Sequence, residues 1–317
     1  MRCEDEPGRD KCFVWNKCLC GDGRPRPSGE RRSPLLLPQD LRSWEPFSRV
    51  DDKSLAAMMA KQMSMNPPPP PSLLRAARQW WSDIAAREGR MAASQQFLVA
   101  ISEFLRDSTP ARRRQRYGDA DYDWDHHVNT TSGAVSWHDR LLGVFHSPYQ
   151  PTEPALFHEM LEGLQQRADL DFREFTFIDL GSGKGRTLLL ASDYAFRRIV
   201  GVELLPTLNQ IAQENLQKYR LESQKCFALE SLCGDATAFA FPAEPMVLYL
   251  FNPFPESGLQ RMLANLEQSL RQNPRPVYVL YHNPLLEHLL GESTAFTKAG
   301  GTHQYSVYKS QESKSSA

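Results

Sequence analysis

The sequence lacks a long apolar run, and its longest apolar stretches are short, such as Met246 to Phe251. A helix that crosses a bilayer needs about 20 apolar residues, so a transmembrane protein is excluded. The first six residues lack the apolar stretch of a secretory signal and are too acidic for a mitochondrial transit peptide. We therefore expect a cytoplasmic protein that has no membrane partner.

The chain also has no excess of either charge. Its 37 basic and 38 acidic residues give a net charge of -1 at pH 7, so no global field selects a nucleic acid or an anionic membrane. The one basic cluster, Arg112 to Arg116, is more typical of a solvated face than of a phosphate-binding site. At 41% hydrophobic residues, the 317-residue chain is not disordered throughout and can bury a large core.

Neither of two metal-like patterns in the sequence is complete. Four cysteines near the N-terminus lack the paired knuckle spacing of a zinc site, and no histidine is near them. They are Cys3, Cys12, Cys18 and Cys20. The acidic, aromatic loop over residues 119–127 imitates the start of a calcium loop, but Trp124 stands where glycine is needed and Thr130 where glutamate is needed. We therefore predict no metal.

Composition divides the chain into four parts. Residues 1–71 form a Pro- and Arg-rich segment that ends in five consecutive prolines, and we expect it to be disordered. Residues 72–150 carry apolar residues at helical spacing and predict a small helical cap and lid region. Strands and helices then alternate over residues 151–310, which predicts one α/β domain, and 311–317 is a polar tail.

The α/β region predicts a Rossmann-like, seven-stranded, doubly wound sheet with a terminal antiparallel hairpin. The expected strands are 175–180, 198–204, 227–229, 246–251, 276–281, 296–300 and 303–308, the last two joined across Gly300-Gly301. The expected helices are 152–165, 186–195, 208–219 and 257–272. Thr152 is the expected cap of the first helix, with Pro154 in its first turn.

A glycine-rich turn, Gly181-Ser182-Gly183-Lys184-Gly185, joins the first expected strand to a helix. Glycines let the backbone approach a ligand closely, and the helix N-terminus favours anionic atoms. A dinucleotide fingerprint that starts at Gly181 needs Gly or Ala at position 186, where Arg186 would obstruct helix packing. The P-loop pattern is absent. The turn therefore departs from both the dinucleotide and the P-loop patterns.

With Asp179 before it, this turn resembles motif I of class I S-adenosylmethionine-dependent methyltransferases, and the resemblance covers about residues 150 to 310. It implies S-adenosylmethionine as the cofactor and methyl transfer as the activity. It also implies a set of cofactor-binding residues at the motif and at the ends of the next strands. They are Thr152, Asp179, Gly181, Ser182, Gly183, Gly185, Glu203 on the ribose and Asp235 at the adenine.

Within that class the chain looks most like the branch of DOT1-like and related bacterial methyltransferases, in which a segment similar to Tyr149 to Thr152 covers the methionine end of the cofactor. The stretch Asn252-Pro253-Phe254-Pro255 resembles the N-P-P-[YF] motif of amino methyltransferases without its second consecutive proline. The resemblance implies Asn252, Pro253 and Phe254 as residues that face the acceptor, and His282 ends the fifth strand on the same edge as an acid or base candidate.

The acceptor stays open, with a protein or a small-molecule amine favoured over nucleic acid. The alternative to a methyltransferase is a non-catalytic cofactor-binding or interaction protein. An NAD-dependent oxidoreductase is a third interpretation. Structural roles also stay open for four of the implied residues. Asp179 could orient the glycine turn, Glu203 and Asp235 could be solvated acids at strand ends, and Asn252 could cap the turn that follows it.

Overall fold

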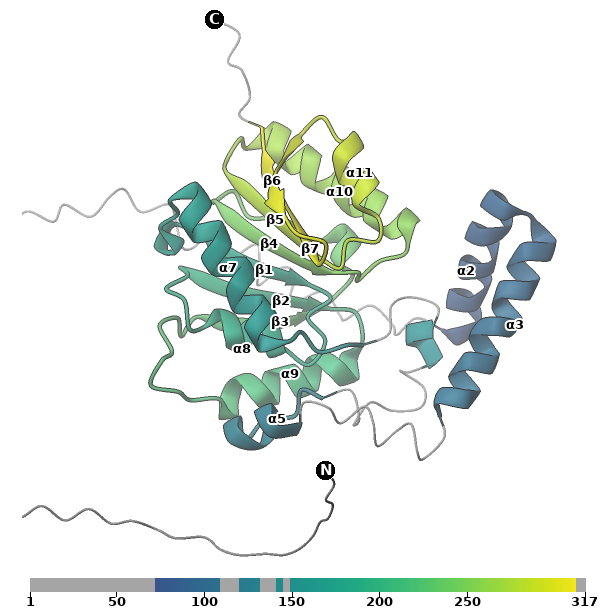
Figure 1. Ribbon diagram of the computed structural model, residues 1–317, viewed down its shortest axis with the longest axis horizontal. Coiled ribbons are helices and arrows are strands. Elements are labelled where there is room, and N and C mark those ends of the chain that lie inside the picture. Colours follow the sequence, from purple (N-terminus) through teal and green to yellow (C-terminus); the bar gives the residue numbers. More distant parts are fainter. Residues whose placement is uncertain (1–71, 109–119, 132–140, 145–148, 312–317) are drawn as a thin grey trace, which may run out of the picture. The chain divides into compact units, whose positions relative to one another are not determined.

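The computed structural model describes residues 72–108, 120–131, 141–144 and 149–311 (Figure 1). The chain divides into two units, 1–50 and 51–317, and every described residue belongs to the second. Residues 1–71 with the N-terminal cysteines, the Arg112 to Arg116 cluster and the polar tail after Gln311 lie outside the described residues. Among the described helices, none is long and apolar enough to cross a membrane.

A seven-stranded sheet organises the described chain. Its strands are β1 Thr176–Leu180, β2 Arg198–Glu203, β3 Leu229–Cys233, β4 Met246–Phe251, β5 Val277–His282, β6 Phe296–Gly301 and β7 Tyr305–Ser310. They lie in the order β3-β2-β1-β4-β5-β7-β6. β1 to β5 are parallel to one another, and β7 is antiparallel to both β5 and β6. This order confirms the predicted Rossmann-like sheet with its terminal antiparallel hairpin.

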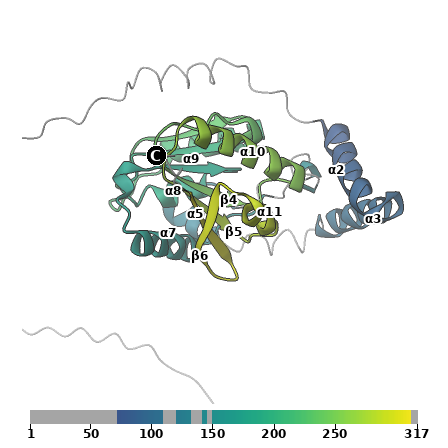
Figure 2. The same ribbon diagram turned by 90° about the horizontal axis from the view of Figure 1, so that it is seen from above.

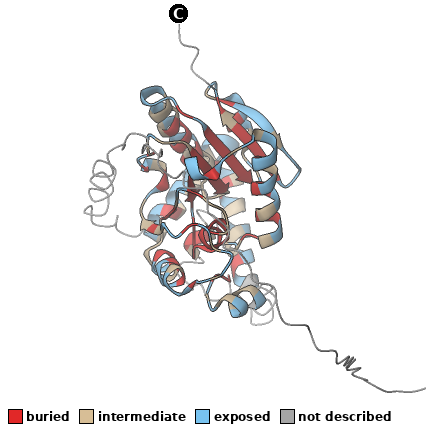
Figure 3. Ribbon diagram, turned by 90° about the vertical axis from the view of Figure 1, so that its left-hand side faces the viewer, coloured by how far each residue is buried: buried red, intermediate tan, exposed pale blue. Residues whose placement is uncertain are grey.

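Helices cover both faces of the sheet because successive strand residues point to opposite sides. In β1, Phe177 packs with α7 (Pro154–Ala168) and α8 (Arg186–Ala191), whereas Ile178 packs with α10 (Glu256–Gln272). Figure 2 shows α7 and α10 on opposite sides of the sheet, and Figure 3 shows the central strands buried. The α/β region also contains the helices α9 Pro206–Lys218 and α11 Glu287–Glu292 and the short 3-10 turns η2 Phe172–Glu174 and η3 Ala236–Ala238.

Before the sheet, α2 (Leu73–Glu88) and α3 (Arg90–Asp107) form the predicted helical pair. Gly89 separates them with φ of 92°, a left-handed conformation that glycine adopts without steric cost. The rings of Trp80 and Phe97 lie in contact across the pair, with centroids 6.2 Å apart and the ring planes tilted by 58°. Sequence periodicity was therefore sufficient to predict these two helices.

Several local expectations need correction. Residues 120–126 form a helix, α5 (Ala120–His126), rather than a loop. The third strand begins at Leu229, two residues after the expected start, and α8 ends at Ala191. Thr152 does not cap α7, whose N-cap is Glu153, because the Thr152 hydroxyl is bonded to the hydroxyl of Tyr249 instead. The hairpin turns at 302–304, since Gly300 and Gly301 belong to β6.

Candidate active site at the strand ends

The carboxyl ends of the parallel strands meet at one edge of the sheet, where open α/β sheets bind ligands. The parallel pairing of β1, β2, β4 and β5 brings the loops after Leu180, Glu203, Phe251 and His282 to this edge. The predicted site residues at positions 179–185, 203, 252–254 and 282 therefore lie together. This edge is the candidate site.

The glycine turn is enclosed on two sides. Gly181, Gly183 and Gly185 have φ of 87°, 54° and 82°, in the region that favours glycine. A Cβ on Gly181 would stand 2.6 Å from Cβ of Pro253, and one on Gly183 would stand 2.2 Å from Cε2 of Tyr149. The backbone of the turn thus packs directly against the β4 loop and against Tyr149, and a side chain at either glycine would displace them.

Glu203 connects the turn to the end of β2. Its side chain is buried, and the two carboxylate oxygens accept hydrogen bonds from the backbone nitrogens of Gly183 and Leu205, each at 2.8 Å. A carboxylate oxygen accepts up to two hydrogen bonds, so these contacts orient the group without excluding a ligand hydroxyl. The Glu203 carboxylate is therefore fixed against the glycine turn, with which the resemblance groups it in one cofactor site.

Asp179 is buried below the turn and accepts a hydrogen bond from the Thr187 hydroxyl in the first turn of α8. Burial raises the pKa of Asp179 to about 7; the Thr187 bond opposes this rise and nearby Glu203 adds to it. The carboxyl group thus orients the start of α8 and changes charge near neutral pH. Close by, the buried Ser182 hydroxyl has no hydrogen-bond partner among the described residues.

Asp235 takes a different position from the other predicted acids. It is exposed after β3, and its carboxylate accepts hydrogen bonds from the nitrogen and the hydroxyl of Thr237, at 2.9 and 2.8 Å. These bonds make Asp235 the N-cap of η3. The adenine contact implied by the resemblance stays a prediction.

The loop after β4 is held by the end of β5. Asn252 has φ of 45°, and its Oδ1 accepts a hydrogen bond from the Tyr281 hydroxyl at 2.9 Å while its Nδ2 donates to the carbonyl of Asn283 at 2.6 Å. Phe254 packs against the core on the α10 side, and Pro253 lies on Gly181. An amide has two donors and a carbonyl that accepts two bonds, so the Asn252 side chain is oriented with capacity for a further partner.

His282 belongs to a buried chain of hydrogen bonds. Its Nδ1 lies 2.8 Å from the hydroxyl of Tyr249, which lies 2.9 Å from the hydroxyl of Thr152. The imidazole stacks on Phe251 at 3.9 Å, and burial lowers the pKa of His282 to about 4. His282 is therefore neutral and a weak base at neutral pH. Sequence reasoning missed Tyr249, whose signal was a lone polar group within an apolar strand.

The helical pair reaches the same edge. Arg87 of α2 pairs with Glu256 at the start of α10, and the Ser257 hydroxyl lies 3.2 Å from the Asp83 carboxylate. Leu205, which follows Glu203 by two residues, packs with the apolar cluster around Ala76 and Leu142. The helical pair therefore contacts the loop after β2 and the first turn of α10.

Arg186 does not obstruct the packing of α8, as the sequence suggested it would. Its side chain is 2% exposed, and its guanidinium lies over the ring of Tyr122 in α5, 4.5 Å from the centroid. The side chain therefore contacts a segment that lies about 60 residues earlier in the chain.

Among the described residues, no group of three His, Cys, Asp or Glu side chains could hold a metal ion.

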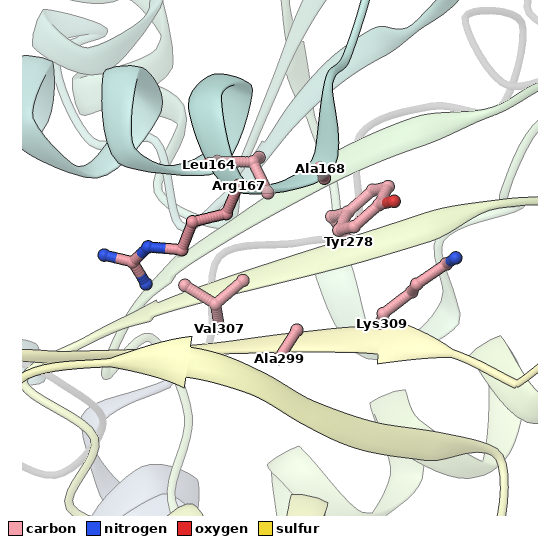
Figure 4. A pocket seen from close by; sticks show the side chains of 7 residues that line it. All are labelled: Leu164, Arg167, Ala168, Tyr278, Ala299, Val307 and Lys309. Carbon is pink, nitrogen blue, oxygen red and sulfur yellow. The ribbon is translucent and has the colours of Figure 1, made fainter.

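A cavity of about 230 Å³ lies away from this edge, between α7 and the hairpin strands (Figure 4). It is lined by Leu164, Arg167, Ala168, Tyr278, Ala299, Val307 and Lys309. Tyr278 is at the amino end of β5, whereas His282 is at its carboxyl end. We therefore place the candidate site at the strand ends, where the polar groups converge, and not in this cavity.

Comparison with known proteins gave structural similarity only. No family model matches the chain, and no curated protein matches it. Similar solved structures include an RNA methyltransferase from Salinibacter ruber in complex with S-adenosyl-L-homocysteine, with 22% identity, a TM-score of 0.34, and coverage of 53% of this chain and 97% of that one. A putative S-adenosylmethionine-dependent methyltransferase from Methanococcus maripaludis has 14% identity, a TM-score of 0.39, and coverage of 51% and 89%. The fold assigned to this chain rests on its own strand order.

Proposed function

We propose that this chain transfers a methyl group from S-adenosylmethionine to an acceptor bound at the carboxyl edge of the sheet. One observation carries the proposal. The glycine turn of the motif is packed between Tyr149 and Pro253, and its Gly183 nitrogen is bonded to Glu203. Three stretches that the resemblance assigns to one cofactor site are thus in direct contact.

The residues of the turn fit the proposed cofactor. Because Gly181 and Gly183 carry no side chain, Pro253 and Tyr149 close directly on the backbone of the turn. The Ser182 hydroxyl is a buried polar atom that has no partner among the described residues. Glu203 supplies negative charge beside the turn, and Asp179 adds to it above about pH 7, where its carboxyl group is ionised. This charge suits a ligand that carries a sulfonium and an amino group. Gly181, Ser182, Gly183 and Gly185 would hold the methionine end, and Glu203 the ribose.

The cofactor, when bound, supplies a methyl carbon that is already activated. The chain then has to place a nucleophile in line with that carbon and to exclude water. Asn252 and the Pro253 carbonyl would orient the acceptor, and Phe254 would pack beside it. Neutral His282 would hold the Tyr249 hydroxyl and could accept a proton only from an acidic acceptor, because its pKa is about 4.

The acceptor we favour is an amine on a protein or a small molecule, since an amide and a carbonyl together orient an N–H donor. Incubation of the full chain with methyl-labelled cofactor and separate pools of protein, amines and RNA tests this choice. Label in RNA alone would overturn it. Absence of transfer from a chain that binds the cofactor would favour the non-catalytic alternative.

Calorimetric titration of the full chain with S-adenosylhomocysteine tests the cofactor, with NADH as the control ligand. We expect micromolar binding of the first and none of the second. Glu203→Gln removes the charge and one acceptor while keeping the shape, and we expect binding to weaken about tenfold or more. Glu230→Gln is the matched control, because Glu230 pairs with Arg198 near the amino ends of β2 and β3. No binding by the folded wild-type chain would overturn the proposal.

A further inference from the structure

One cation lies inside the glycine turn and a second directly follows it, and both are withdrawn from solvent. Lys184 is 0% exposed and Arg186 is 2% exposed. Isolated charges are costly to bury, so each must be compensated by partners within the protein. Burial lowers the pKa of Lys184 to about 8 and that of Arg186 to about 10. Both side chains have hydrogen-bond partners in one stretch, residues 120–131.

Lys184 and Arg186 hold three consecutive residues of that stretch. Lys184 Nζ donates to the side-chain oxygen of Asn129 at 2.9 Å and to the carbonyl of Thr131 at 2.7 Å. Arg186 Nε donates to the hydroxyl of Thr130 at 2.7 Å, and the guanidinium also pairs with Asp123 at 3.3 Å. We call residues 129–131 the latch segment.

Asp123 shapes the latch segment from the side of α5. Its carboxylate accepts hydrogen bonds from the backbone nitrogens of Thr130 and Thr131, at 2.7 and 2.8 Å, and from the Thr130 hydroxyl. Thr130 is 0% exposed, so these bonds are shielded from water. The Thr130 hydroxyl accepts from Arg186 and donates to Asp123, which makes it the central atom of the arrangement.

Helix α9 contacts both the latch segment and the glycine turn through Asn215. Asn215 of α9 is buried and donates from Nδ2 to the carbonyls of Asn129 and Lys184, at 3.0 and 2.9 Å, while its Oδ1 accepts from the Asn129 nitrogen at 2.9 Å. One side chain thereby bridges the latch segment and the glycine turn.

Aromatic rings secure α5 beside α9 (Figure 1). Arg186 lies over Tyr122, whose ring stacks on His126 at 4.2 Å, and His126 stacks on Tyr219 at 5.7 Å. The stack begins at Arg186, directly after the glycine turn, and ends at Tyr219, the C-cap of α9.

The latch segment also sets the position of Tyr149. The Tyr149 hydroxyl donates to the Thr130 carbonyl, and the Tyr149 ring lies directly on Gly183. A displacement of Thr130 would therefore move the ring that forms one wall of the turn. We propose that Lys184 and Arg186 are positioning residues that fasten the latch segment to the glycine turn, so that Tyr149 is held as a wall of the cofactor site. The cofactor part of this inference rests on the proposed function.

The test compares two substitutions at Thr130 in the full chain. Thr130→Val keeps the shape and removes the hydroxyl between Arg186 and Asp123, whereas Thr130→Ser keeps the hydroxyl. We expect S-adenosylhomocysteine to bind Thr130→Val about tenfold more weakly than the wild type, and Thr130→Ser within about twofold of it. Glu230→Gln, which breaks an ion pair elsewhere in the sheet, should leave affinity unchanged.

A merely structural role would lower the melting temperature of Thr130→Val and leave its affinity intact below the transition. Hydrogen exchange without ligand supplies the second measurement. Peptides over residues 181–187 should exchange faster in Thr130→Val than in Thr130→Ser or Glu230→Gln, because the turn loses its fastening. Equal exchange in all three variants would overturn the inference whether or not the chain binds S-adenosylhomocysteine. Equal affinity of Thr130→Val and Thr130→Ser for a ligand that the wild type binds would overturn the cofactor part alone.

Discussion

Substitution of Gly183 by alanine tests the geometry of the glycine turn most directly. The new Cβ would stand 2.2 and 2.5 Å from two ring atoms of Tyr149, closer than carbon atoms approach one another. The ring cannot yield freely, because its hydroxyl is bonded to the Thr130 carbonyl. The backbone also has φ of 54°, which alanine adopts only at a cost.

The three costs can be added roughly. Left-handed backbone costs a residue other than glycine about 1 kcal/mol, a displaced hydrogen bond about 1 kcal/mol, and overpacking of the ring about 1 kcal/mol or more. We expect Gly183→Ala to lower the free energy of unfolding by about 3 kcal/mol, or the melting temperature by about 8 °C. Gly234→Ala is the matched control, because no atom lies within 4 Å of its Cβ position. It should change stability by less than about 0.5 kcal/mol.

Urea unfolding followed by circular dichroism measures both variants, and a double-mutant cycle identifies the contact. In Gly183→Ala with Tyr149→Ala, the ring that collides is gone. We expect the double variant to be about 2 kcal/mol more stable than the sum of the single effects predicts. Strict additivity, or a Gly183→Ala variant as stable as Gly234→Ala, would refute the proposed packing of Tyr149 on the turn.

Three further predictions concern side chains of the site. The folded chain keeps the Asp179 proton up to about pH 7, whereas the unfolded chain releases it near pH 3.8. The free energy of unfolding should therefore fall by up to about 4 kcal/mol between about pH 4 and 7. In urea titrations at several pH values, Asp179→Asn should remove this slope. Tyr249→Phe should cost about 2 kcal/mol in thermal unfolding because Thr152 and His282 lose a partner, while Tyr278→Phe should cost less than about 0.5. Asp235→Ala should weaken S-adenosylhomocysteine binding about fivefold by calorimetry, and unchanged affinity would restrict Asp235 to capping η3.

Much of the sheet could be predicted from local pattern. β1, the glycine turn and the start of α8 follow one another within eleven residues, and each is specified by its own residues. The antiparallel hairpin was predicted because two short strands are too close in sequence for a crossover helix. Even so, the turn was misplaced by two residues, since Gly301 belongs to β6, where a Cβ would stand 2.5 Å from the Tyr305 carbonyl.

Helix α5 could not be predicted in the same way. Its seven residues, Ala-Asp-Tyr-Asp-Trp-Asp-His, include three aspartates and are too few to form a stable helix alone. What stabilises it is the stacking of Tyr122 and His126 between Arg186 and Tyr219, residues that lie 60 and more positions later. A local pattern carries no information on such distant partners.

By itself the sequence determined which residues are apolar, where glycine interrupts them, and therefore the order of strands and helices and the place of the glycine turn. The tertiary structure decided what polar side chains do there. Lys184 lies in the glycine-rich turn and Arg186 directly follows it, a pattern that suits an anion, yet both are buried against residues 122–131. The reason is physical: a buried charge is tolerated only where the fold supplies compensating partners, and partners remote in the chain are brought to it only when the fold forms.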